Sequence, residues 1–429
     1  MSDKTDDRAR RDGGASSAQG PAGQRRVSLA ARVYGVLCIL DGIVKVPFIL
    51  MMLGILAYLA THDPALLSEV VIGDNTQLTL VLLGIYVAIM LVVAVLVVAL
   101  GVALLRSRRR RVHALAVKLI VLAVVELLID IMLEGIGANL IGTTVQLIVL
   151  IALSVTIDPS LRAERAARRI EEERENAEAE AEGMEGRDLT GKGYMDLNFF
   201  NLFWEFVVCC VLGLVLEIIW HFVVVEPGAY QDRAGLLFGP FSPIYGFGAV
   251  LVTLALNRLY DKNPIIIFVV SAIVGGGFEY LTSLFMELSF GVTAWDYSDY
   301  TILGMPDPIA VACDGRTSTM FVCMWGVLGF VWVKALLPLL LRFINLIPWK
   351  LRYGLTTVCA ALMLVNGVMT LESLDCWFER VSGVQPTTPV ERFYAEHYDN
   401  AFMEHRFQSM TIAPESSTRL ADGAAAETR

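Results

Sequence analysis

Residues 77–105 read QLTLVLLGIYVAIMLVVAVLVVALGVALL, without one charged side chain. A helix of this length and apolarity can cross a bilayer, whose hydrocarbon core is about 30 Å thick and needs about 20 residues. Eight further apolar blocks occur at 31–60, 112–134, 138–157, 199–225, 236–257, 264–288, 317–341 and 353–372. The sequence therefore predicts an all-α polytopic membrane protein with about nine transmembrane helices.

The composition supports this class and excludes two others. Of the 429 residues, 55% are hydrophobic and 18% are charged, whereas soluble globular proteins carry about 25% charged residues. A water-soluble enzyme and an intrinsically disordered protein are both excluded. Residues 1–26 are polar and contain no apolar core, so we expect a cytoplasmic tail and no cleavable signal peptide.

Lysine and arginine gather in alternate loops, and this asymmetry sets the orientation of the spans. They are frequent in residues 1–32, 106–111, 158–196, 258–262 and 342–352. Loops 61–76 and 134–142 contain none, and loops 226–236 and 289–316 contain only Arg233 and Arg316. The pattern predicts a cytoplasmic N-terminus and, with nine spans, an extracellular C-terminus.

The same pattern divides the chain into five parts. Residues 159–196 are rich in Ala, Glu and Arg but lack the apolar positions of a coiled coil, so they predict a charged helical linker in the cytoplasm. The linker joins two bundles of four and five helices. The parts are 1–30, a disordered tail; 31–158, a four-helix region; 159–196, the linker; 197–372, a five-helix region; and 373–429, a polar C-terminal tail.

The first bundle contains charged residues at membrane depth. Such a group costs at least about 2.5 kcal/mol at the bilayer centre, so it normally faces the protein interior. Asp41 and Lys45 are four residues apart and can neutralise each other. Glu126, Asp130 and Glu134 also recur every four residues and share one helical face. Two interpretations stay open: Lys45 pairs with one of these three acids and fixes helix register, or the set forms a proton or cation pathway.

The second bundle contains Glu217 in the fifth span and Glu279 and Glu287 in the seventh. Ser283 is four residues from each of the latter two, so the three side chains share one face. Arg316 is the cation nearest in sequence to the outer end of that face. A buried Glu without a cation can carry a proton or bind a cationic substrate; alternatively, Glu279 hydrogen-bonds to Tyr or Trp as a structural group.

Two irregular segments accompany these acids. Residues 235–248 read GLLFGPFSPIYGFG, and irregular backbone at membrane depth is tolerated only where it is buried in protein or lines a cavity. Residues 295–300 read WDYSDY, where the rings suit the membrane interface and the acids suit a cavity mouth. The candidate cavity-lining residues are Gly239, Pro240, Pro243, Tyr245, Gly246, Trp295, Asp296 and Tyr297.

These motifs occur in an order that resembles a known family. GLLFGPFSPIYGFG is followed by FEYLTSLFMELSFG at 278–291, WDYS at 295–298, DGR at 314–316 and MWGVLG at 324–329. The set is similar to the bacterial membrane-protein family described as "putative ABC transporter permease (type IV)", strongly over about 197–345 and faintly to 411. The resemblance marks Glu217, Gly239, Pro240, Pro243, Tyr245, Gly246, Glu279, Tyr280, Ser283, Glu287, Trp295, Asp296, Tyr297, Gly315, Arg316 and Trp325.

The resemblance implies a permease in the bacterial plasma membrane that works with a separate ATP-binding subunit. The chain departs from the family pattern in the long segment between Asp299 and Cys313. The first four spans lie outside the resemblance, and the sequence does not assign them a role.

Three functional hypotheses follow. A permease component needs no ATPase residues of its own, and acids in both halves favour a cationic substrate. A proton-coupled secondary transporter or channel-like protein would use Glu279 or the acids of the third span. A non-transport scaffold or membrane enzyme is the third, but no catalytic residue is predicted because no HExxH or local Ser–His–Asp motif is present.

The expected partners follow from the first hypothesis. They are the lipid bilayer, a separate ATP-binding subunit and, as an open alternative, further copies of the chain. We expect no nucleic acid partner, no cofactor and no metal, since none of the seven cysteines forms a CxxC pair.

Overall fold

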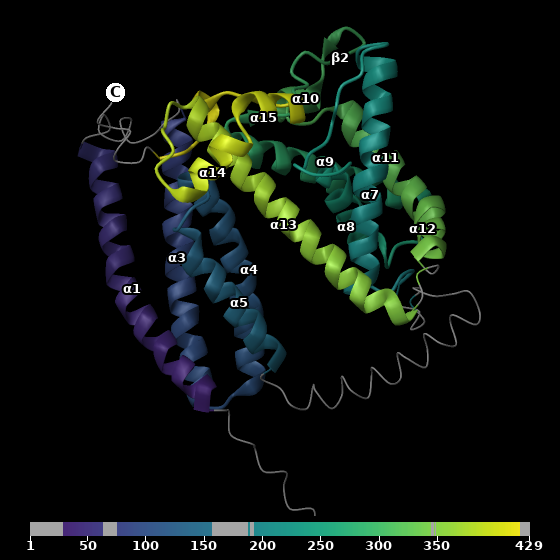
Figure 1. The fold of residues 1–429 in the computed structure, drawn as a ribbon. Coiled ribbons are helices and arrows are strands. Elements are labelled where there is room, and N and C mark those ends of the chain that lie inside the picture. Colours follow the sequence, from purple (N-terminus) through teal and green to yellow (C-terminus); the bar gives the residue numbers. More distant parts are fainter. Residues whose placement is uncertain are drawn as a thin grey trace, which may run out of the picture.

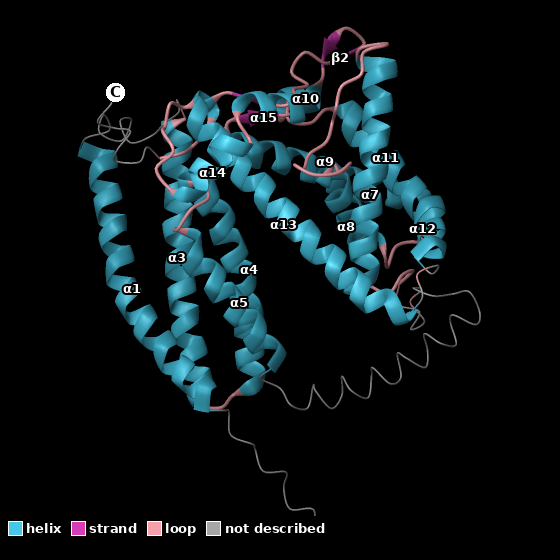
Figure 2. Cartoon of the chain, viewed as in Figure 1, coloured by secondary structure: helices cyan, strands magenta, loops and turns pink. Residues whose placement is uncertain are grey.

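The computed structural model describes residues 29–62, 75–156, 188, 193–344, 347 and 349–420. Nearly all secondary structure in these residues is helical, and the strands are two residues long (Figure 2). The predicted all-α membrane architecture is confirmed. Of the tail predicted at 1–30, residues 1–28 lie outside the described residues, as does nearly all of the predicted linker.

The first group of helices contains α1 (Leu29–His62), α3 (Thr76–Leu105), α4 (Arg109–Glu134) and α5 (Leu140–Thr156). Aliphatic side chains fill its interior, among them the fully buried Leu100, Leu104 and Leu119. Small residues let α1 and α3 approach closely, since a Cβ added at Gly101 would lie 2.5 Å from the carbonyl oxygen of Gly35. Small residues at the crossing are typical of membrane helices, whose association depends on close packing.

The second group is built from longer and shorter helices around Trp325. It contains α7 (Phe199–Trp220) with the π-helical turn η1 (His221–Val225), α8 (Pro243–Leu256), α9 (Pro264–Phe290), α11 (Thr319–Val331), the π-helical turn η2 (Trp332–Leu336), α12 (Leu337–Ile344) and α13 (Trp349–Val381). Trp325 packs directly on the backbones of α8 and α9, because a Cβ added at Gly248 or Gly275 would lie 2.6 or 2.4 Å from its ring. The glycines therefore allow this aromatic contact.

Short elements close one end of the molecule. β1 (Val292–Thr293) pairs antiparallel with β4 (Thr411–Ile412), and β2 (Thr301–Ile302) forms a hairpin with β3 (Met305–Pro306). Leu303 and Gly304 connect this hairpin with φ angles of 53° and 78°, the positive values that a two-residue type I′ turn requires. The remaining short helices are α10 (Pro308–Ala312), α14 (Pro389–His397), α15 (Asn400–Arg406) and η3 (Pro414–Ser416).

Each predicted span overlaps a helix in the described part of the chain, but the span predicted at 236–257 is helical only from Pro243. Within that part, 6 helical segments are long and apolar enough to cross a membrane: 31–55, 76–105, 199–225, 264–290, 319–344 and 354–381. Helices α5 and α8 are apolar but shorter, and α4 carries three acids and a basic first turn. Nine spans require α4, α5 and α8 to cross the membrane as well, and this stays a prediction.

Helix α13 is longer than the sequence predicts. It continues to Val381 instead of ending at residue 372. Trp377 and Phe378 are buried in this extension, and the charge of Asp375 is paired with Arg419 at 2.6 Å. Tertiary contacts thus support helix where the local sequence is polar. Figure 1 shows α13 running obliquely across the space between the two groups of helices.

The chain end from residue 411 to 420, here termed the C-terminal strap, ties the two groups together. The Asn75 side chain, just before α3, donates to the Ser416 carbonyl at 2.7 Å. The Thr418 amide donates to the Leu288 carbonyl of α9 at 3.0 Å, and the Leu420 amide donates to the Leu133 carbonyl of α4 at 2.8 Å. The C-terminal part, yellow in Figure 1, therefore spans one end of both groups.

Candidate functional site

Glu279 is an enclosed acid of α9 in the second group. Only 5% of its surface is exposed. Its two carboxylate oxygens accept hydrogen bonds from the Tyr297 hydroxyl at 3.2 Å and the Thr317 hydroxyl at 2.8 Å. No ion pair of Glu279 occurs among the described residues, so neutral donors hold this carboxylate where α9 meets the loop before α11.

Tyr297 connects the outer loop to this acid. Burial raises the pKa of the Tyr297 phenol, and the neighbouring charge of Glu279 raises it further. The hydroxyl therefore keeps its proton at neutral pH and acts as a donor. The ring stacks on Phe321 with centroids 4.3 Å apart. The expected aromatic residue at the mouth of the site thus contacts the acid directly.

Glu217 has a cationic partner that sequence reasoning missed. The Nε and Nη2 atoms of Arg233 each lie 3.0 Å from its Oε1 atom. Tyr245 of α8 interacts electrostatically with both Glu217 and Glu279, so the two acids belong to one cluster. Arg233 appeared in the sequence only as a charge in the loop after the fifth span, and its distance from Glu217 along the chain gave no signal of pairing.

Arg316 lies at the outer end of the α9 face, where the sequence analysis expected a cation. Its Nη2 atom is 2.6 Å from Glu287 and its Nη1 atom is 3.1 Å from Asp314. Ser283 is buried one helical turn from Glu279 on the same face. The structure therefore places Glu279, Ser283 and Glu287 as the spacing predicted, with Arg316 paired to the outermost of the three.

We expect Arg316→Ala and Glu287→Ala to have matching effects. Each leaves a partly buried charge without its partner, and a loss of about 1–3 kcal/mol of stability is typical of such changes. The double variant should lose less than the sum of the two single losses, because residues in contact are coupled. Unfolding in mixed micelles measures all three; additive losses would contradict the pairing.

Trp295 and Asp296 shape the outer loop. The Trp295 indole donates to the Arg316 carbonyl at 3.0 Å, and Asp296 accepts from the Ser298 hydroxyl at 2.6 Å. Gly315 has a φ of +72°, and a Cβ there would lie 2.2 Å from the Asp296 carboxylate. The described contacts of Trp295 and Asp296 thus fold the loop around Tyr297, and these two residues do not enter the Glu279 cluster.

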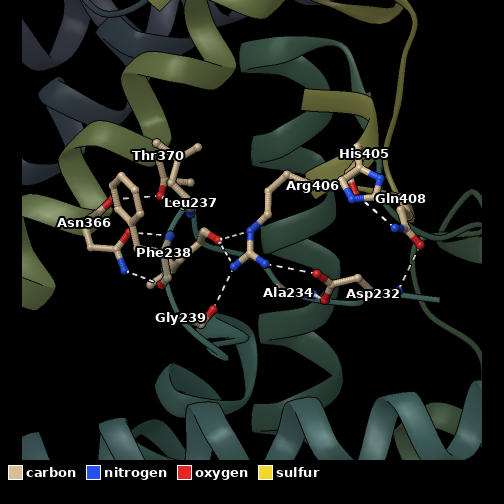
Figure 3. A network of polar contacts seen from close by, with 11 residues as sticks. Asp232, Ala234, Leu237, Phe238, Gly239, Asn366, Thr370, His405, Arg406 and Gln408 are labelled. Carbon is tan, nitrogen blue, oxygen red and sulfur yellow. Dashed lines mark hydrogen bonds and ion pairs between the residues drawn. The ribbon is translucent and has the colours of Figure 1, made fainter. Parts of the chain in front are cut away.

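The broken segment before α8 is held by side chains from distant parts of the chain (Figure 3). Arg406 of α15 donates to the carbonyls of Leu236 at 2.6 Å and Gly239 at 2.7 Å, and it pairs with Asp232 at 3.0 Å. From α13, Asn366 donates to the Phe238 carbonyl at 2.8 Å. Thr370, one helical turn further along α13, accepts a hydrogen bond from the Leu237 amide. The irregular backbone therefore has protein partners, as membrane burial requires.

The glycines and prolines that were predicted to interrupt the helix at 235–248 have different structural roles. Gly239 has a φ of +76°, a conformation that favours glycine, and Pro243 is the first residue of α8. Gly246 faces α7, since a Cβ there would lie 2.4 Å from the Cys210 sulfur. Gly239 and Pro240 are exposed, so of this run it is Tyr245 that reaches the acid cluster.

Glu205 is a buried acid that the sequence analysis did not select. It is fully buried in α7, accepts a hydrogen bond from Thr253 through one oxygen, and has no partner for Oε2. Trp332 in turn donates to the Thr253 hydroxyl at 2.7 Å. In the sequence, Glu205 stands near the start of an apolar span and therefore looks like a residue at a helix end. The pattern gave no signal that Glu205 is buried.

The N-terminal polar set gathers around one cavity of about 520 Å³, bounded by α1, α3, α4 and the start of α5. The cavity is lined by Asp41, Lys45, Glu126, Asp130 and Glu134, together with neutral polar and apolar side chains. Lys45 pairs with Asp41 at 3.0 Å on its own helix. Lys45 also interacts electrostatically with Glu126 of α4, although no ion pair between the two occurs among the described residues. The interpretation in which Lys45 pairs with an acid of α4 and fixes helix register therefore stays a prediction.

Asp307 anchors the long segment between Asp299 and Cys313. Its carboxylate accepts from the amides of Ile309 and Ala310 at 2.9 Å and from the Thr319 hydroxyl at 2.8 Å. Burial alone raises the pKa of Asp307, but the hydrogen bonds from Ala310 and Thr319 outweigh it, so the pKa lies below its ordinary value. Ionised Asp307 therefore stabilises the loop.

This stabilisation has a defined pH dependence. Because the folded pKa is lowered, the contribution is fully present above the ordinary aspartate pKa of about 4 and is lost as the pH falls through the folded value. Asp307→Asn should cost roughly 1–3 kcal/mol of local stability at pH 7 and less at a pH below the folded pKa of Asp307. Hydrogen exchange of residues 307–319 measures this; an equal effect at both pH values would contradict the account.

Comparison with known proteins finds a similarity in the second half of the chain. Residues 204–371 match the model of the family described as "Putative ABC-transporter type IV". No curated protein and no solved structure matches the chain. The match covers α8, α9, α11 and most of α7 and α13, and it includes Glu217, Glu279 and Arg316; the cavity of the first group lies outside it. Residues 204–371 are thus similar to an ABC-transporter-like membrane family, as the ordered motifs predicted.

Proposed function

We propose that the chain is the membrane-spanning permease component of a transport system that a separate ATP-binding subunit energises. The observation that carries the proposal is the acid cluster inside the matched segment. Glu217 and Glu279 are linked through Tyr245, beside a break in helical structure. A transport-related membrane family and buried polar groups next to irregular backbone together fit a translocation pathway.

The chemistry of Glu279 supports a cationic substrate. An ionised carboxylate is only an acceptor of hydrogen bonds, and here the donors from Tyr297 and Thr317 are neutral hydroxyls. The negative charge is therefore available to an ammonium or a similar cation. Arg233 compensates Glu217, which leaves Glu279 as the uncompensated member of the cluster.

The proposal also assigns sides of the plasma membrane. Arg258 and Lys262 are exposed in the loop that follows α8, and Arg342 is exposed in the last turn of α12. Basic residues at these ends favour the cytoplasmic side. These ends would face the ATP-binding subunit. The end closed by β1, β4 and the C-terminal strap would then lie outside.

The test is affinity purification of the chain from native membranes in several mild detergents, with mass spectrometry of the proteins that co-purify. The proposal expects one ATP-binding protein in stoichiometric amount. A preparation that contains no ATP-binding protein in any detergent would contradict the permease assignment.

Glu205 favours a second candidate, a proton-coupled transporter. A fully buried carboxyl group with one unpartnered oxygen is a natural proton carrier, since burial opposes its ionised form. This candidate needs no ATPase. Uptake driven by a pH gradient in proteoliposomes, and lost in Glu205→Gln, would favour it; ATP-dependent uptake that Glu205→Gln retains would exclude it.

A further inference from the structure

The cavity of the first group of helices has the properties of a ligand site. It measures about 520 Å³ and opens between α1, α3, α4 and α5. Its polar side chains include the acids of α4 and the neutral groups Asn139, Thr143 and Gln146. Pockets with an apolar wall and a few convergent polar groups are typical of sites for small molecules.

The charge of this cavity is unbalanced. Four carboxyl groups (Asp41, Glu126, Asp130 and Glu134) line it with one ammonium group, that of Lys45. Lys45 is already paired with Asp41 at 3.0 Å. Among the described lining residues, Glu126 and Asp130 therefore face the cavity without an ion pair to a protein cation.

Glu126 is enclosed but makes no direct polar contact with the described residues. Its surface is only 9% exposed, and it has no hydrogen bond or ion pair among the described residues, although the charge of Lys45 acts on it from a greater distance. Leaving a buried carboxylate without a hydrogen-bond donor is costly. Its neighbour Asp130, by contrast, accepts from the Tyr86 hydroxyl at 3.5 Å and interacts with the Asn139 side chain. Because Glu126 lines the cavity, a ligand in the cavity can supply the missing donor.

The spacing of the acids along α4 favours an organic cation over a metal ion as the ligand. In the described part of the chain, no three His, Cys, Asp or Glu side chains converge as metal ligands. Glu126, Asp130 and Glu134 are instead spread along α4 in steps of about 6 Å, given a rise of about 1.5 Å per residue. Leu37, Met90 and Val149 supply apolar surface in the same cavity.

We propose that this cavity binds a linear amine that carries two or more ammonium groups. A saturated four-carbon spacer separates two ammonium nitrogens by about 6 Å, given bonds of about 1.5 Å, which matches one step of the acid ladder. One ammonium pairs with Glu126 and the next with Asp130, while the methylene groups contact the apolar wall. The claim concerns the first group of helices only, so it holds or fails independently of the proposed permease function.

An ammonium group can also come from a lipid, because the ethanolamine headgroup carries one. The two sources differ in the number of charges and in solubility. We therefore place the full-length chain in nanodiscs of phosphatidylcholine and phosphatidylglycerol, which contain no primary amine, and measure binding calorimetrically. The probes are 1,4-diaminobutane, spermidine, 1-aminobutane and Mg²⁺.

The proposal expects saturable binding of 1,4-diaminobutane and spermidine, with 1-aminobutane at least 10-fold weaker. Glu126→Gln should weaken diamine binding at least 10-fold. Lys45→Met should strengthen it because a competing cation is removed. Glu396→Gln, at an exposed position of α14, is the matched control and should change nothing.

Three results would overturn the proposal. They are no saturable diamine binding to the wild-type chain, equal affinity for 1-aminobutane and the diamine, or displacement of the diamine by micromolar Mg²⁺. A diamine affinity that falls when phosphatidylethanolamine is added would assign the site to the lipid headgroup instead. The comparison of probes uses the wild-type chain, so it does not depend on the folding of any variant.

Discussion

Glu279→Gln is expected to abolish function while the protein still inserts and folds. The substitution removes the charge of Glu279 but keeps a side chain of the same size, and the hydroxyls of Tyr297 and Thr317 can rotate to bond an amide. A cation or proton that depends on this carboxylate loses its site. We expect at least a 100-fold loss of transport rate, which corresponds to about 2.7 kcal/mol.

The measurement is complementation of a strain that lacks the chain, together with the amount of the variant in membranes. Glu396→Gln, an exposed change of the same chemistry on α14, should complement fully. Full activity of Glu279→Gln would remove this carboxylate from the pathway. Loss of the variant protein from the membrane would instead assign Glu279 a structural role.

The ion pair of Asp375 with Arg419 should carry the largest single contribution of side-chain contacts to stability. The two side chains are 3% and 5% exposed and lie 2.6 Å apart. Arg419 also lies over the Phe378 ring at 5.2 Å, and Asp375 accepts the Ile136 amide at 3.1 Å. Breaking a buried pair by removing one partner typically costs about 3–5 kcal/mol, so Arg419→Met should lose that amount.

Removing the second charge as well should reverse much of this loss. In the double variant Asp375→Asn with Arg419→Met, no buried charge is left without a partner, and the carbonyl oxygen of the introduced asparagine side chain can still accept the Ile136 amide. Unfolding in mixed micelles compares the variants, with the exposed Arg392→Ala as the control. A double variant that is less stable than Arg419→Met would show that the ion pair does not account for the loss.

Local patterns predicted the helices well where the apolar runs are long. Residues 77–105 and 264–288 correspond closely to α3 and α9. The acids of α4 face one cavity because their spacing of four residues matches the helical period. These features depend on neighbours along the chain, so the sequence contains enough information to predict them.

Features that depend on distant contacts could not be predicted in this way. The pairing of Glu217 with Arg233 and the support of residues 235–242 by Arg406 join segments whose separation in sequence carries no periodic signal. The extension of α13 was missed for the same reason. Among its polar side chains, Asp375 is compatible with burial only because Arg419 of the C-terminal strap pairs with it. Glu205 was missed because burial of a single acid depends on Thr253 and its surroundings.

The central claim is that this chain transports its substrate with the help of an ATP-binding subunit. The most direct measurement is the subunit ratio and the ATP hydrolysis rate of the complex purified from native membranes and placed in nanodiscs. The account predicts a fixed ratio of an ATP-binding chain to this chain, and hydrolysis that falls when Glu279→Gln replaces the wild type. A preparation that hydrolyses no ATP, whichever detergent is used for the purification, would contradict this claim.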